Sequence, residues 1–221
     1  VKEKRTIIIG YSLFCFWLII QYSWSLAPET HSELIFLYIK YSALIWIITT
    51  TVDSEKHLHW FCWAHILGCT YLGWIAYTQY DGGRFESFGG SDINEANAGA
   101  LQMVSAILIS ASIFLIAKFK EKILIIFCMP LVVNAIILTS SRSAFIAAAT
   151  GGVVFNLFAQ KKYRLLVKTL SILAIVGFFG LTNQEFWDRM NTLKEAGEQI
   201  EGVDTGSSRI AIAKAQFEMF K

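Results

Sequence analysis

The feature that most constrains the fold is a succession of seven apolar runs, each close to the length that crosses a membrane. About 20 mostly apolar residues form a helix that spans the roughly 30 Å hydrocarbon core of a bilayer. In that core each backbone N–H and C=O must be bonded within its own segment, which favours helices. We therefore predict an all-α, polytopic membrane bundle with about seven transmembrane helices, at residues 6–26, 34–52, 60–80, 97–117, 123–140, 143–159 and 165–182.

The composition supports a membrane protein and excludes several other classes. Charged residues make up 16% of the chain, against about 25% in soluble domains. The net charge of +2 gives no reason to expect nucleic acid as a partner. The four cysteines all lie within apolar runs and form no CxxC pair, which indicates packing and not a disulfide framework or a metal site.

The basic residues alternate between the loops and predict the orientation. Cytoplasmic loops of membrane proteins carry an excess of Lys and Arg. One set of loops here carries only Arg84 and Arg142. We predict that the other set is cytoplasmic, together with the N-terminus, and it carries Lys2, Lys4, Arg5, Lys56, Lys118, Lys120, Lys122, Lys161, Lys162, Arg164 and Lys168.

The chain divides into two parts by composition. Residues 1–182 hold the predicted spans and form the transmembrane bundle. Residues 183–221 are richer in charge, and we expect them to begin a large loop on the outer face that contains amphipathic helices. Ser207 or Ser208 is placed to cap a second helix of this loop, with Arg209 in its first turn.

Arg142 stands in the sequence "TSSRS" at the predicted outer boundary, where the fifth span ends and the sixth begins. One interpretation is an interfacial arginine that reaches lipid headgroups or caps the carbonyls of the fifth span. The other is an anion site. The guanidinium offers five donors, Ser141 and Ser143 add hydroxyls, and the start of the sixth helix adds free N–H groups. The sequence alone leaves both open.

The glycine-rich outer loop at residues 81–100 contains further candidates. Arg84 is its only basic residue. Asn94 and Asn97 are suited either to bonding the backbone or to binding sugar hydroxyls. The pair Asp92 and Glu95 is typical of a capping box, and we expect it to begin the fourth helix.

Three other cations are candidates outside that loop. Lys40 is the one full charge well inside a predicted span, where it either snorkels to the surface or faces a cavity. Arg189 and Arg209 lie in the outer segment, where each is either a solvated residue or part of an anion site.

The order of these pieces resembles the O-antigen ligase and Wzy polymerase family of bacterial envelope glycosyltransferases, over residues 80–221. The resemblance rests on "DINEANAGAL" after the glycine-rich loop, then "LTSSRSAFIAAATGG", then "SSRIAIAKAQFEMFK" in the outer segment. Such proteins continue with a histidine-bearing outer loop and more spans. On that basis we expect the chain to be a C-terminally truncated piece that is inactive alone.

The resemblance implies a function and a location. It implies transfer of a glycan from a polyprenyl diphosphate carrier to an acceptor hydroxyl, on the outer face of the bacterial inner membrane. The acceptor is lipid A–core, another glycan or a protein. The departing diphosphate needs cations, and no carboxylate cluster fit for a metal is present, so the implied enzyme uses neither metal nor cofactor.

The resemblance also implies roles for particular residues. Arg142 and Arg209 occupy the positions of its catalytic arginines, and we expect them to bind the diphosphate. We expect the substrates to be contacted by Arg84, Ser141, Ser143, Lys40, Asn94 and Arg189.

Several alternatives remain at this point. A Wzy-type polymerase and a protein O-oligosaccharyltransferase share the same skeleton as a ligase. From other classes, a transporter or flippase-like protein predicts broken helices and paired charges at the midplane. A non-catalytic membrane scaffold predicts no dependence on Arg142 or Arg209.

Overall fold

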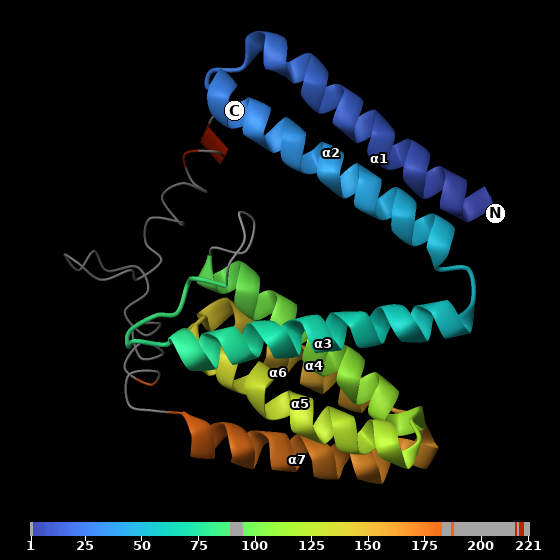
Figure 1. Ribbon diagram of the computed structural model, residues 1–221, viewed down its shortest axis with the longest axis vertical. Helices are drawn as coiled ribbons and strands as arrows, with labels where there is room; N and C mark the ends of the chain where they lie inside the picture. The colour runs from blue at the N-terminus through green and yellow to red at the C-terminus, as the bar shows by residue number, and fades with distance from the viewer. Residues whose placement is uncertain (1, 89–94, 183–186, 188–214, 216, 219–221) are drawn as a thin grey trace. The chain divides into compact units, whose positions relative to one another are not determined.

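The computed structural model of the chain describes residues 2–88, 95–182, 187, 215, 217 and 218. Over these residues the protein is all-helical and contains no strand, which confirms the all-α part of the predicted fold class. An α-helix lies over each of the seven apolar runs (Figure 1). These are α1 (Lys2–Gln21), α2 (Pro28–Thr51), α3 (Glu55–Gln79), α4 (Ala96–Ile116), α5 (Phe119–Leu138), α6 (Arg142–Phe158) and α7 (Arg164–Leu181).

Five of the helical segments are long and apolar enough to cross a membrane. They correspond to α1, α2, α4, α5 and α7. Helix α6 is apolar but has only 17 residues, and α3 is not among the candidates. Three histidines and several tyrosine and tryptophan residues, which score low on hydropathy scales, lie in α3. A membrane protein is thus supported, whereas the count of seven spans stays a prediction.

The first of two compact units, residues 1–64, is built around a hairpin of α1 and α2 (Figure 1). Cys15 of α1 lies 3.1 Å from the hydroxyl of Ser42 on α2, and His31 bonds the carbonyl of Leu18 at 2.9 Å. None of the α2 residues is buried. The apolar side chains of this hairpin are therefore available to lipid.

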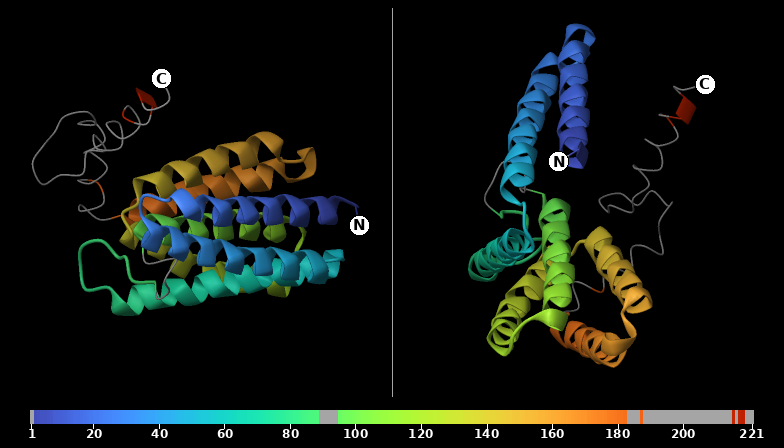
Figure 2. Two further views of the ribbon diagram at one scale, coloured as in Figure 1. Left: turned by 90° about the horizontal axis from the view of Figure 1, so that it is seen from above. Right: turned by 90° about the vertical axis from the view of Figure 1, so that its right-hand side faces the viewer.

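The second unit, residues 65–221, holds a ring of four helices in which α4 contacts α5 and α6, and α7 also contacts both (Figure 2). Its core consists of small and medium apolar side chains such as Met103, Val132 and Ala144, each with no exposed surface. Short connections join the helices, so successive helices run antiparallel. The two ends of the ring consequently carry different loops.

Close packing of small residues sets the helix spacing in the second unit. At Gly73 on α3, an added Cβ would lie 2.6 Å from the backbone oxygen of Leu131 on α5. At Gly151 on α6, it would lie 2.8 Å from the side chain of Leu108 on α4. Small residues allow such approach between helices in a bilayer, where apolar side chains gain little by leaving lipid.

Substitution of Gly73 by alanine should destabilise the second unit, because a methyl group there overlaps the backbone of α5. Overpacking of this kind costs about 1–3 kcal/mol. Thermal unfolding of the detergent-solubilised protein measures the effect. Gly68→Ala on the same helix is the matched control, since nothing lies within 4 Å of its Cβ position. Equal melting temperatures for the two variants would contradict the packing described.

Candidate functional site

The "TSSRS" sequence lies between two helices, as expected, and the connection that it forms is very short. Helix α5 ends at Leu138 and α6 begins at Arg142. Ser140 adopts a left-handed conformation with a φ of 47°, the one non-glycine residue with positive φ in the described part of the chain. Such a conformation costs of order 1–3 kcal/mol and persists only where the surroundings impose it. The turn is therefore held in a strained, fixed geometry.

Ser141 is the N-cap of α6 and has only 1% of its surface exposed. Its hydroxyl oxygen accepts a bond from the backbone N–H of Ala144 at 3.3 Å, which satisfies one free donor of the helix start. The same hydroxyl donates to Oδ1 of Asn97 at 2.8 Å and lies 3.1 Å from the hydroxyl of Ser143. This serine thus connects the beginning of α6 to the beginning of α4.

Arg84 completes the cluster from the glycine-rich loop. Its Nε donates to the carbonyl of Thr139 at 3.3 Å, and its Nη2 donates to Oδ1 of Asn97 at 3.1 Å. Its Nη1 lies 3.2 Å from a carboxylate oxygen of Glu86. The Arg84 side chain is 24% exposed, so it is neither buried nor fully solvated. One guanidinium therefore joins the loop to α4 and to the end of α5.

The backbone and aromatic rings of the loop fix Arg84 in place. The N–H of Phe85 donates to the carbonyl of Leu138 at 3.0 Å, at the C-terminus of α5. Phe85 packs edge-on against Phe88, which has no exposed surface. The Phe88 ring lies against Gly99 of α4, where an added Cβ would come within 2.4 Å of it. The residue before the arginine, Gly83, has a φ of 73°, which favours glycine.

The start of α4 differs from the predicted capping box. Glu95 is the N-cap residue, three positions later than the expected Asp92, and its side chain makes no capping bond. Its carboxylate instead accepts a bond from Nδ2 of Asn97 at 3.0 Å. Asp92 lies outside the described residues. Glu95 has an extended backbone, with a φ of −116° and a ψ of 127°, so it is not the third helical residue that a capping box requires.

We call the group formed by Arg84, Asn97, Ser141 and Ser143 the outer cluster. It brings together three site residues that were predicted from the sequence, namely Arg84, Ser141 and Ser143. Arg142 adjoins it as the first residue of α6 and is partly buried. Two helix N-termini, those of α4 and α6, carry partial positive charge here. Two guanidinium groups and two helix dipoles favour an anion at this end of the helices, whereas the carboxylates of Glu86 and Glu95 add negative charge beside Arg84 and Asn97.

The remaining predicted residues are Lys40, Asn94, Arg189 and Arg209. Lys40 belongs to the first unit, where its ammonium lies 4.7 Å from the ring centroid of Phe36. Asn94, Arg189 and Arg209 lie outside the described residues. The binding role was assigned to Asn94, whereas Asn97 bonds two members of the cluster. The signal in the sequence that could have identified Asn97 was its place in the first turn of α4.

No group of three or more His, Cys, Asp or Glu residues is placed to hold a metal ion within the described ranges. Two carboxylates that the structure describes in this region, Glu86 and Glu95, each already contact a member of the outer cluster. Metal independence stays a prediction.

Comparison with known proteins bears on this site. The family model described as O-antigen ligase matches residues 127–221. Over these residues, which make up less than half of the chain, the protein is similar to the O-antigen ligase family. The match supports the family expected from the sequence, over a shorter range than the residues 80–221 that carried the resemblance. It indicates a membrane protein with a role in glycan transfer. Neither a curated protein nor a solved structure matched the chain.

The O-antigen ligase match includes both catalytic candidates, Arg142 and Arg209. Arg84 and Asn97 lie outside the matched range, and the outer cluster joins them to it. The cluster thus extends the ligase-like part of the chain with residues that the family model does not cover.

A double-mutant cycle on Arg84 and Asn97 tests whether the outer cluster is one energetic unit. Asn97→Ala should destabilise the protein by about 1–3 kcal/mol, because it leaves two donors without an acceptor. Combined with Arg84→Ala, the two losses should fall short of their sum by at least about 0.5 kcal/mol. The measurement is thermal or denaturant unfolding in detergent.

The control cycle pairs Asn97→Ala with Arg164→Ala, at the start of α7. The ring of antiparallel helices separates these residues by most of a helix length, roughly 30 Å for α4. Their effects should add. Additivity in the Arg84 cycle as well would contradict the coupling.

Proposed function

We propose that the protein transfers a glycan from a polyprenyl diphosphate carrier to an acceptor hydroxyl at the outer face of the bacterial inner membrane. The match of residues 127–221 to the O-antigen ligase family carries this proposal. The acceptor in the ligase reaction is the lipid A–core of lipopolysaccharide. A second glycan unit or a protein hydroxyl takes its place in the polymerase and protein transferase reactions.

The chemistry of the leaving group assigns the arginines their roles. When the glycosidic bond to the carrier breaks, negative charge develops on the diphosphate, and preorganised cations stabilise it. Arg142 and Arg209 bind the diphosphate in this proposal. Guanidinium groups suit phosphate oxygens because their donors form a planar fork. The donor's lipid tail lies along the spans, and no metal or other cofactor takes part.

The outer cluster supports the proposal by holding the backbone of the turn that carries Arg142. Ser141 anchors the start of α6 to Asn97, and Ser140 precedes it in a strained conformation. Arg84 positions this turn through the carbonyl of Thr139. The remaining donors of Arg84, together with Ser143, contact the outer oxygens of the diphosphate or the first sugar. Lys40, Asn94 and Arg189 keep the substrate-contact roles expected from the sequence.

The distribution of charge supports an active site on the outer face. In the second unit, Lys118 and Lys162 mark the end of the helices where α4 ends and α7 begins. The outer cluster lies at the opposite end, where α4 and α6 begin. Basic loops favour the cytoplasmic side. The cluster then faces outward, together with the segment that begins at residue 183.

Replacement of Arg142 tests the proposal directly. In a strain whose only gene copy carries Arg142→Ala, attachment of glycan should fall by at least about 100-fold, comparable to loss of one preorganised donor in other enzymes. Arg142→Lys keeps the charge but loses the planar fork, so we expect an intermediate rate. Electrophoresis of the extracted lipopolysaccharide or polysaccharide measures the product, and its length distribution distinguishes a ligase from a polymerase.

Arg164→Ala is the matched control, an arginine at a helix start on the opposite end of the same unit. It should leave transfer unchanged when protein levels are equal. Wild-type transfer by Arg142→Ala would contradict the diphosphate role and favour a scaffold. Accumulation of the donor on the cytoplasmic side would favour a flippase-like protein.

Chelation tests the absence of a metal. Purified protein supplied with a polyprenyl diphosphate glycan and an acceptor should retain its transfer rate in excess EDTA, because arginines and not a metal ion neutralise the leaving group. Product formation is followed by the mass of the acceptor. A strict requirement for added Mg²⁺ or Mn²⁺ would refute the arginine mechanism.

A further inference from the structure

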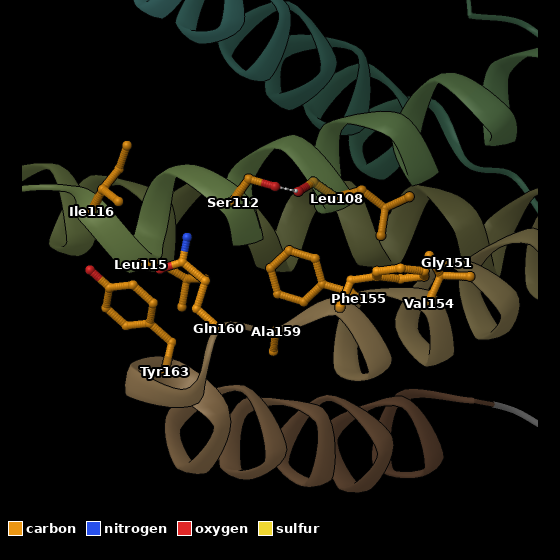
Figure 3. Close-up of a pocket in the computed structure, with 11 residues that line it drawn as sticks. Leu108, Ser112, Leu115, Ile116, Gly151, Val154, Phe155, Ala159, Gln160 and Tyr163 are labelled. Carbon is orange, nitrogen blue, oxygen red and sulfur yellow. Dashed lines mark hydrogen bonds between the residues drawn. The ribbon is translucent and has the colours of Figure 1, made fainter.

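An apolar groove lies on the second unit at the end opposite the outer cluster (Figure 3). Its volume is about 520 Å³, within the range typical of small-ligand sites. Leu108, Ser112, Leu115 and Ile116 of α4 face Gly151, Val154 and Phe155 of α6 across it. The lining is completed by Phe158, Ala159, Gln160 and Tyr163.

Gly151 lines the groove at a point where α6 lies close to α4, since a Cβ there would come within 2.8 Å of the Leu108 side chain. On α6 the groove follows positions 151, 154, 155 and 158, which share one helix face. On α4 it extends over nine residues from Leu108 to Ile116, about 12 Å along the helix. Its shape is therefore elongated and parallel to the helices.

One end of the groove is polar and bordered by cations. Gln160 and Tyr163 lie beside Leu115 and Ile116 at this end (Figure 3). The ammonium of Lys162 lies 5.2 Å from the ring centroid of Tyr163. Arg164 donates from Nε to the carbonyl of Ala159, a lining residue, at 3.4 Å. Lys122 lies 5.3 Å from the ring of Phe114 on α4.

The charge at this end is almost entirely positive. Glu121 is the sole acidic residue between positions 117 and 165, and its carboxylate is bonded to the backbone N–H of Lys118. Six basic residues surround it in the two connections, namely Lys118, Lys120, Lys122, Lys161, Lys162 and Arg164. A ligand that matches this site has an anionic head and an apolar tail.

We propose that the groove binds one acyl chain of an anionic phospholipid, with the phosphate held at Lys162, Gln160 and Tyr163. An anionic lipid complements both the apolar lining and the adjoining cations. Basic pockets between membrane helices are a known means of binding such headgroups. A helix from another protein would satisfy the apolar lining alone and leaves the cations without a partner. Under the proposed orientation the lipid belongs to the cytoplasmic leaflet.

Native mass spectrometry of the complete protein in detergent tests the proposal. The probes are dioleoyl phosphatidylglycerol, which is anionic, and dioleoyl phosphatidylethanolamine, which has the same chains and no net charge. We expect tighter binding of the anionic lipid. Lys162→Gln should weaken that binding about fivefold, the effect of one basic residue near a membrane surface. Lys56→Gln, at the start of α3, is the charge control and should have no effect.

A second variant tests the groove itself. Val154→Trp places a large side chain in the groove, whereas Val153→Trp on the same helix lies outside the lining. The first should reduce binding of phosphatidylglycerol at least about fivefold below the second. Both residues are about half exposed, at 47% and 59%, so neither substitution disturbs the core.

Three results would overturn the proposal. Equal binding of the two lipids would show that the cations do not contribute to binding. Equal binding of phosphatidylglycerol by the two tryptophan variants would show that the lipid does not occupy the groove. Displacement of the lipid by millimolar inorganic phosphate would show that the site recognises a phosphate without its chains.

Discussion

The candidate site depends on the hydrogen bonds that the side-chain amide of Asn97 makes. Its oxygen accepts one bond from Arg84 and one from Ser141, and its nitrogen donates to Glu95. Three segments that are distant in sequence are joined through this single side chain. A hydrogen bond to a charged group such as Arg84 is typically worth about 1.5–3 kcal/mol, so the junction restrains both the loop and the α5–α6 turn.

Much of the helical architecture follows from the sequence alone. Each of the seven apolar runs forms a helix, the structure expected of segments long enough to cross a bilayer, where the backbone must satisfy its own polar groups. The turn at "TSSRS" was placed correctly, because serine at an N-cap stops the preceding helix and begins the next. Whether α3 and α6 cross the membrane does not follow, because the histidines of α3 and the 17-residue length of α6 weaken the hydropathy signal.

The candidate site was predictable in its residue types but not in its contacts. Arg84 and Ser141 were candidates because charged and hydroxyl groups are rare in so apolar a chain. The sequence around Arg84 or Ser141 did not indicate that both bond Asn97, which is 13 positions from Arg84 and 44 from Ser141. Such contacts depend on how α4 packs against α5 and α6. The capping box expected at Asp92 and Glu95 was wrong, because Glu95 has an extended backbone and is itself the N-cap residue of α4.

The central claim is that the guanidinium of Arg142 binds the diphosphate of the lipid-linked donor. A structure of the complete protein with a polyprenyl diphosphate bound tests it most directly, through the distance from the Arg142 nitrogens to the nearest phosphate oxygen. The account predicts a charge-assisted hydrogen bond of about 2.7–2.9 Å at the outer cluster. A diphosphate beside Lys162 at the opposite end of the helices, or at neither end, would contradict it.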